Sequence, residues 1–133
     1  MIETMISVFK TFPNIVAAYI FGSRVYGKKG KTSDYDVALL FKGDYSLDEQ
    51  LDVTLKLAHV FDVDLDSIDV IELNHAPVEL AYEVISKGKL VYCKDNENRV
   101  AFETRLMREY IDLKPHLDVY YNLMYKRFLK KLP

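Results

Sequence analysis

The sequence predicts an α/β sandwich, because apolar stretches rich in β-forming residues alternate with segments of helical periodicity. Its 133 residues fit one compact domain, and half of them are hydrophobic, which is enough to bury a core. No apolar run approaches the roughly 20 residues that a membrane-spanning helix needs. Cys93 is the single cysteine, so no internal disulfide can form, and no signal peptide is evident. We therefore expect a soluble protein of the reducing cytoplasm.

The first half of the chain predicts two helices and two strands. Apolar residues at helical spacing predict a short helix over residues 2–9. The β-rich run 15–21 is expected as a buried strand. Residues 37–41 are apolar without alternation, which is typical of a central strand covered on both faces. Leucines four residues apart then predict an amphipathic helix over residues 47–60.

The second half predicts two more strands and further helices. Residues 67–73 are expected as a third strand, and a proline in the first position favours a helix over residues 77–87. Residues 90–92 predict a short final strand. Helical periodicity returns from 95 to 132, where we expect Pro115 to divide the segment into two helices, because proline lacks the N–H that an interior helical turn needs.

The charge is distributed unevenly along the chain. Residues 1–93 hold 9 Lys/Arg and 14 Asp/Glu, for a net charge of −5, and residues 94–133 hold 9 and 6, for +3, which together return the overall −2. A protein that grips a nucleic-acid backbone usually has a strong basic excess. Template-directed polymerisation and direct nucleic-acid binding are therefore not expected.

The clearest chemical signal is Gly22-Ser23 followed by Asp34 and Asp36. A small-residue turn after a strand can offer backbone N–H groups and a hydroxyl to phosphate oxygens. Alternate strand residues point to the same side and lie roughly 7 Å apart along the chain, so the two carboxylates can reach the same small volume. Carboxylates placed in this way can hold divalent cations about 3.5–4 Å apart, as in two-metal phosphoryl-transfer sites. The combination predicts an enzyme that handles nucleotides.

These motifs also carry a family resemblance. The patterns G-S-R-x-x-G (22–27) and S-D-x-D (33–36), with Asp69 on a later strand, resemble the nucleotidyltransferases of the DNA polymerase β superfamily. The chain is most similar to the minimal nucleotidyltransferase (MNT) group, and its segment Y-I-D-L-K-P-H-L resembles the helical extension of MNT antitoxins that pair with HEPN-domain ribonuclease toxins. The resemblance implies a mixed sheet flanked by helices over residues 1–94 and a C-terminal helical extension of the same domain over 95–133.

The resemblance implies transfer of AMP from ATP to a hydroxyl, with Mg²⁺, two ions being expected. Asp34 and Asp36 would ligate the metal, and Asp69 would complete the site as a further ligand or as the base that accepts the hydroxyl proton. Gly22 and Ser23 would hold the triphosphate, and Arg24 would pair with a phosphate oxygen. In this group the acceptor is a tyrosine of the toxin, so the implied partner is a cognate HEPN toxin.

Other carboxylates compete with Asp69 for the third position. Asp62, Asp64 and Asp66 imitate the start of a calcium loop, but the positions where that loop needs Gly and Glu hold Ser and Leu. We therefore expect these three in a solvated turn. Glu72 is expected to be structural or exposed.

Several further groups have an ordinary structural interpretation. Lys28, Lys29 and Lys31 form a solvated loop or contact phosphate or the partner. The three histidines, His59, His75 and His116, have no metal-ligand spacing. Tyr120, Tyr121 and Tyr125 are expected to pack on a helix. A cluster of basic residues near the C-terminus either forms a solvated helix end or docks an acidic partner, and the sequence leaves both interpretations open. The cluster consists of Lys126, Arg127, Lys130 and Lys131.

Two alternative functions stay open at the level of sequence. One keeps the chemistry but uses a small-molecule hydroxyl as the acceptor, although about 40 residues after the last strand leave little room for a substrate domain. The other is a non-catalytic antitoxin that neutralises its partner by direct contact through the C-terminal helices.

Overall fold

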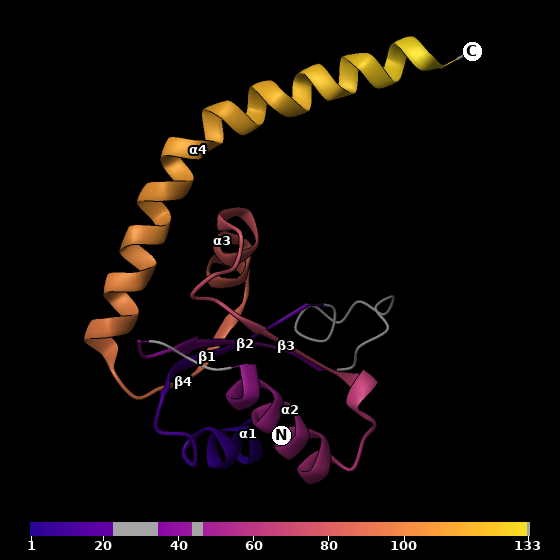
Figure 1. Ribbon diagram of the computed structural model, residues 1–133. Helices are drawn as coiled ribbons and strands as arrows, with labels where there is room; N and C mark the ends of the chain where they lie inside the picture. The colour runs from indigo at the N-terminus through magenta and orange to yellow at the C-terminus, as the bar shows by residue number, and fades with distance from the viewer. Residues whose placement is uncertain (23–34, 44–46, 133) are drawn as a thin grey trace.

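The computed structural model describes residues 1–22, 35–43 and 47–132 (Figure 1). Within these residues, four strands form one mixed sheet in the order β3-β2-β1-β4. The neighbours β1 and β2 are antiparallel, as are β1 and β4, whereas β2 and β3 are parallel. The strands are β1 (Ile15–Phe21), β2 (Tyr35–Phe41), β3 (Ile68–Glu72) and β4 (Lys89–Cys93). The mixed sheet flanked by helices that the sequence predicted is confirmed.

In the described segments of the chain, four α-helices cover the two faces of this sheet (Figure 1). They are α1 (Ile2–Phe9), α2 (Leu47–Phe61), α3 (Val78–Lys87) and α4 (Asn96–Lys131), with a short 3₁₀ helix, η1 (Leu65–Ser67), before β3. The helices α1 and α2 pack on one face, and α3 with the first half of α4 packs on the other. None of the helices in the described parts of the chain is long and apolar enough to cross a membrane.

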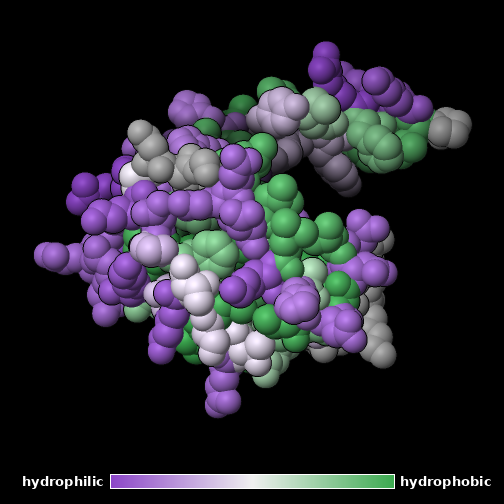
Figure 2. All heavy atoms as spheres, turned by 60° about the horizontal axis from the view of Figure 1, so that its bottom comes forward, coloured by the Kyte–Doolittle hydropathy of each residue, from purple (hydrophilic) through white to green (hydrophobic). Residues whose placement is uncertain are grey.

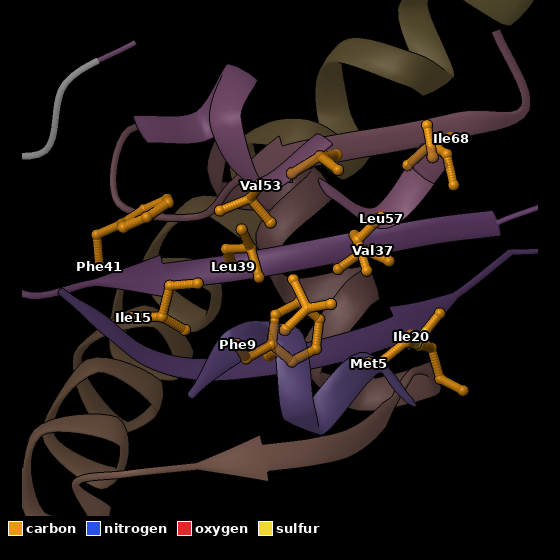
Figure 3. Packing of buried hydrophobic residues seen from close by; sticks show 14 residues of the cluster. Met5, Phe9, Ile15, Ile20, Val37, Leu39, Phe41, Val53, Leu57 and Ile68 are labelled. Carbon is orange, nitrogen blue, oxygen red and sulfur yellow. The ribbon is translucent and has the colours of Figure 1, made fainter. Parts of the chain in front are cut away.

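The central strand β2 contributes to a core on each face, as its unbroken apolar run predicted. Val37 and Leu39 point toward α1 and α2, where they meet Phe9 and Leu57 (Figure 3). Ala38 and the other even-numbered positions point toward α3 and α4. Because β2 is covered on both sides, its side-chain alternation fixes which residues at its ends face which helices.

The join between α3 and β4 requires a glycine. A Cβ atom at Gly88 would lie 2.4 Å from the backbone oxygen of Val84 and 3.0 Å from that of Ile20. The N–H of Gly88 also donates to the Val84 oxygen at 2.7 Å, which caps α3. This close approach brings the end of α3 against the end of β1, and the expected termination of the helix at this point is confirmed.

The expectation of two helices after residue 95 is wrong, because α4 is a single helix of 36 residues with Pro115 inside it. Proline removes one backbone hydrogen bond, and helices commonly accommodate its ring by bending. In Figure 1, α4 bends along its course and continues. The ion pair between Lys114 and Asp118 spans the proline at 3.4 Å, and Leu113 and Leu117 are partly covered on the side of α3. The exposed ion pair contributes only about 0.3–0.5 kcal/mol, so the packing of the two leucines on the side of α3 is the more important support for the helix around Pro115.

A buried tyrosine attaches α4 to the sheet. Tyr19 is 2% exposed, and its hydroxyl donates a hydrogen bond of 2.7 Å to Glu103 Oε1. Arg99 Nη1 donates to the other oxygen of Glu103 at 2.9 Å. Burial, and then the hydrogen bond to Glu103, raises the pKa of Tyr19 well above the usual range of a tyrosine. The neutral hydroxyl therefore links β1 to the beginning of α4.

This link predicts a loss of stability at high pH. The unfolded Tyr19 ionises near pH 10 while the folded residue keeps its proton, so its contribution to the free energy of unfolding is present below about pH 10 and is lost above it. The decline is about 1.4 kcal/mol per pH unit for one proton. We expect Tyr19→Phe to show a shallower decline in urea unfolding between about pH 9 and pH 11. Tyr125→Phe, at an exposed position, should keep the wild-type slope; equal slopes in all three proteins would contradict the assignment.

Candidate active site

Two aspartates lie side by side at one end of the sheet. In the parallel pairing of β2 with β3, Asp36 is in register with Asp69. Neighbouring strands are about 4.8 Å apart, and residues in register point to the same face. Asp36 shares its face with Ala38, which packs against α3 and α4, so both carboxylates belong to the α3–α4 face of the sheet. Asp69, which the sequence placed on a later strand, thus lies on the strand next to that of Asp36.

The two carboxylates differ in their environment. Asp36 is 3% exposed and is the buried charged side chain among the described residues, whereas Asp69 is exposed. Burial fixes the position of the Asp36 carboxylate but makes its charge costly unless that charge is compensated. Exposure leaves the Asp69 carboxylate accessible to a substrate and to water.

The end of β1 lies next to this pair. Phe21 is the partner of Asp36 on the antiparallel side, and Gly22 follows it directly. Gly22 has a φ of 86°, in the left-handed region that residues with a Cβ atom rarely adopt. The backbone of Gly22 therefore leaves the sheet beside Asp36, at the place where the sequence predicted a phosphate-binding turn.

The carboxylates of Asp36 and Asp69 are suitable ligands for a hard divalent cation. Mg²⁺ prefers oxygen ligands and is usually held by one or two carboxylates together with water and substrate phosphates. A cation between Asp36 and Asp69 would offset the cost of burying the first carboxylate and the repulsion between the two. Within residues 1–22, 35–43 and 47–132, no group of three or more His, Cys, Asp or Glu side chains gathers to form a complete metal site. Water, substrate phosphate and the predicted ligand Asp34, which lies outside the described residues, would complete the coordination of an ion held by this pair.

Part of the predicted site lies outside the described residues. Ser23, Arg24 and Asp34 belong to the segment 23–34, as do Lys28, Lys29 and Lys31. Their roles stay predictions from the sequence.

The carboxylates that competed with Asp69 lie elsewhere. Asp62, Asp64 and Asp66 are exposed in the turn and 3₁₀ helix before β3, as expected. Glu72 accepts a hydrogen bond from the backbone N–H of His75 at 3.0 Å and contacts His75 Nδ1 at 2.7 Å. Glu72 therefore shapes the loop after β3, which fits its predicted structural role.

Sequence reasoning missed a groove between α3 and α4. It encloses about 770 Å³, and its lining includes Tyr82, Tyr110, Leu117 and Tyr121. The rings of Tyr82 and Tyr110 stack with centroids 3.7 Å apart. Helical spacing shows that these residues lie on helix faces, but only the packing of α3 against α4 brings them together.

The prediction that three tyrosines of the C-terminal segment pack on a helix is wrong. They are 51–61% exposed: Tyr120, Tyr121 and Tyr125. The hydroxyl of Tyr121 reaches the Glu79 carboxylate at 3.0 and 3.1 Å, but its ring stays open to solvent. The reason is that α4 continues beyond α3, so the body has no surface left to cover this part of the helix.

The fold and the placement of the carboxylates define a nucleotidyltransferase. The family model described as polymerase beta, nucleotidyltransferase matches residues 3–97, and this chain belongs to that family. The resemblance carried by the Gly-Ser and Asp-x-Asp motifs is thereby confirmed.

This chain is also similar to a named protein and to solved structures. A protein adenylyltransferase MntA from Aphanizomenon flos-aquae is 27% identical over 119 residues, which cover 84% of this chain and 79% of that relative. A crystal structure of a toxin–antitoxin with AMP-PNP has a TM-score of 0.74 at 22% identity, covering 92% of this chain and 98% of its own. A complex of a tri-AMPylated Shewanella oneidensis HEPN toxin with its MNT antitoxin matches with a TM-score of 0.68 at 22% identity, over 93% and 99%. These structures share the fold of this chain.

The paired carboxylates predict a ligand-induced stabilisation that depends on Asp36. A ligand at ten times its Kd stabilises the folded state by about 1.4 kcal/mol, which raises Tm by about 4 °C for a chain of this size. We expect Mg²⁺ with an ATP analogue that cannot be cleaved between the α and β phosphates to raise the Tm of the wild type in this way. Asp36→Asn should lose most of the shift, because the buried ligand is neutralised.

Asp66→Asn is the matched control, since Asp66 is an exposed carboxylate in η1, the 3₁₀ helix directly before β3. It should keep the full shift in Tm. A full shift in Asp36→Asn would contradict the assignment of Asp36 to the metal and nucleotide site.

Proposed function

We propose that this chain is an Mg²⁺-dependent protein adenylyltransferase that acts as an antitoxin, and that it transfers AMP from ATP to a tyrosine hydroxyl of a cognate HEPN ribonuclease toxin. The observation that carries the proposal is the pairing of buried Asp36 with exposed Asp69 beside Gly22, in a nucleotidyltransferase fold. The name of the similar MntA relative, and the tri-AMPylated toxin in the complex of similar fold, support AMP transfer to a protein.

The different exposure of the two aspartates suggests different roles. Asp36 cannot move far within the sheet, so it serves as the fixed ligand, together with Asp34. Asp69 faces solvent on the same face, where an acceptor hydroxyl can approach. It completes the metal site or accepts the hydroxyl proton as a general base. Bound Mg²⁺, as one or two ions, would neutralise phosphate charge and lower the pKa of the acceptor hydroxyl.

The transfer is a substitution at the α-phosphorus of ATP. The acceptor oxygen forms a bond to that phosphorus, the bond from the phosphorus to the oxygen bridging to the β-phosphate breaks, and pyrophosphate leaves. The hydroxyl proton goes to the Asp69 carboxylate or to water. Gly22 lets the backbone approach the phosphates closely, and we assign Ser23 and Arg24 to the same triphosphate.

The division into a core over residues 1–94 and an extension over 95–133 belongs to the same proposal. The family match to residues 3–97 supports a catalytic unit that ends near the start of α4. The extension is not independent of that core, because Phe102 and Leu106 of α4 are buried on the sheet. A cytoplasmic location, where ATP and a ribonuclease target are present, fits this activity.

The test is an incubation of the purified chain with ATP, Mg²⁺ and its co-encoded partner, followed by intact-mass measurement of both proteins and a ribonuclease assay of the partner. We expect the partner to gain the mass of one or more AMP groups and to lose ribonuclease activity. Asp36→Asn or Asp34→Asn should slow the labelling by at least about 100-fold, because metal-assisted charge stabilisation is lost. Asp66→Asn should label as the wild type does.

Three results would refute the proposal. Labelling by Asp36→Asn at the wild-type rate would exclude the mechanism. A partner that is silenced in a stable complex without any mass gain would instead indicate inhibition by contact, which the exposed second half of α4 makes the strongest competing function. Labelling of a small hydroxyl compound in place of the partner would indicate the small-molecule alternative.

A further inference from the structure

An aromatic stack holds the first residue of β2. The ring centroids of Tyr35 and Phe61 are 4.7 Å apart, and the two ring planes are within 4° of parallel. Both side chains are partly buried and pack against the core on the α1–α2 face of the sheet. Stacked aromatic rings stabilise each other beyond the apolar area that they bury. The stack therefore joins the start of β2 to the last residue of α2.

Tyr35 is the immediate neighbour of Asp36, and in the sequence it stands between Asp36 and the predicted ligand Asp34. Successive strand side chains point to opposite faces, so the Tyr35 ring lies on the α1–α2 face and the Asp36 carboxylate on the other. The two residues share one planar peptide unit, which transmits a displacement of Tyr35 to Asp36. The stack can therefore position a metal ligand from the opposite face of the sheet.

The place of Tyr35 in the sheet explains why a support from α2 matters. The described pairing of β1 with β2 runs from Asp36 onward, and Tyr35 is in register with Ile68, the first residue of β3. Tyr35 thus lies at the border of the region where three strands run side by side, and the ends of elements open more readily than their centres. A contact that fixes Tyr35 also fixes Asp36, the next residue along the strand.

The end of α2 is built to keep Phe61 in place. Asp62, the next residue, has a φ of 54°, in the left-handed region. Its N–H donates to the His59 oxygen at 3.2 Å, and the N–H of Val63 donates to the Ala58 oxygen at 3.0 Å. These two bonds form the Schellman motif that ends many helices, and Val63 packs on the same core as Ala58, as that motif favours. The last turn of α2 is therefore fixed where Phe61 meets Tyr35.

The stack and the carboxylates lie on opposite sides of the sheet. Tyr35 and Phe61 pack with α1 and α2, whereas Asp36 shares its face with α3 and α4. Figure 2 turns the α1–α2 side of the molecule toward the viewer, with hydrophobic (green) and hydrophilic (purple) side chains mixed on it. A substitution of Phe61 can thus move Asp36 without adding or removing any group on the face that carries the carboxylates.

We propose that Tyr35 and Phe61 are positioning residues of the candidate active site, and that the stack of their rings sets the position of the Asp36 carboxylate and thereby the affinity for Mg²⁺ and the rate of AMP transfer. The inference rests on the proposed function for the reaction. It adds two residues on the opposite face of the sheet that control the geometry of the metal site.

The test begins with Phe61→Leu in the full chain, which removes the ring but keeps the core apolar. We expect kcat for AMP transfer to the co-encoded partner to fall at least about tenfold, since a misplacement of about 1 Å can cost about 100-fold. The Mg²⁺ concentration at half the maximal rate should rise about tenfold, as is typical when the support of a metal ligand is lost. The KM for the partner should stay within about twofold of the wild type. Phe61→Tyr, which keeps the ring, should retain all three wild-type values.

Val53→Ala is the matched control for a loss of core packing. Val53 is 0% exposed and lies in the same helix about two turns before Phe61. Urea unfolding measures how far each variant is destabilised. Val53→Ala should lose stability but keep kcat and the Mg²⁺ dependence within about twofold of the wild type. Equal losses of kcat in Val53→Ala and Phe61→Leu would show that stability alone is responsible and would overturn the proposal.

A double variant tests whether the two rings act through one contact. Tyr35→Leu and Phe61→Leu each remove the stack, so we expect the chain that carries both to have a kcat within about twofold of the slower single variant. If the two reductions in kcat multiply instead, the rings act independently and the proposal is wrong.

Ligand binding provides a readout that needs no partner. The Tm shift with Mg²⁺ and the ATP analogue should be smaller in Phe61→Leu, and more Mg²⁺ should restore it, whereas Val53→Ala should keep the wild-type shift. Unchanged kcat and Mg²⁺ dependence in Phe61→Leu would overturn the role of the stack and leave the proposed function intact. If the wild type transfers no AMP, the proposed function fails. The stack is then judged by the Tm shift alone, and equal shifts in Phe61→Leu and the wild type would overturn its role.

Discussion

The parallel pairing of β2 with β3 is the constraint on which the candidate site depends. It sets Asp36 in register with Asp69, so both side chains lie on one face of the sheet at the same height. A parallel connection needs a crossover, which α2 supplies on the face opposite the carboxylates. The crossover helix therefore covers one face of the sheet, and the two carboxylates share the other face with α3 and α4.

Burial on both sides makes this pairing resistant to slippage. A shift of one residue would turn Val37 and Leu39 away from Phe9 and Leu57 and would reverse the direction of Asp36. The cost of misplacing a core residue thus also protects the position of Asp36, the proposed metal ligand. The apolar neighbours of Asp36 in the same strand fix its position, while Asp69, on the edge strand of the sheet, is exposed to solvent.

The strands could be predicted from the sequence, but the contacts between helices could not. Residues 15–21 were predicted with the bounds that β1 has, because an apolar β-rich run bordered by turn residues leaves little ambiguity. The neighbourhood of Asp36 and Asp69 was also predictable, since the motif and the following strand define it. Pro115 was misjudged, because its local cost was considered without the packing of Leu113 and Leu117 on the side of α3 and without the freedom of an exposed helix to bend. The Tyr82–Tyr110 stack could not be predicted from the sequence, because its two rings belong to different helices and no local pattern specifies how those helices pack.

The attachment of α4 through Tyr19 and Glu103 has a mechanical consequence. The helix is about 54 Å long, given a rise of about 1.5 Å per residue, and its described contacts with the sheet and α3 end at Tyr121. It therefore acts as a lever, in which a small rotation of the attached part becomes a larger displacement at the free end. The hydrogen bonds among Tyr19, Glu103 and Arg99 help to set the direction of this lever, together with the stack of Tyr110 on Tyr82. Residues deep in the sheet can in this way determine where the far tip of the molecule points, without touching anything that the tip meets.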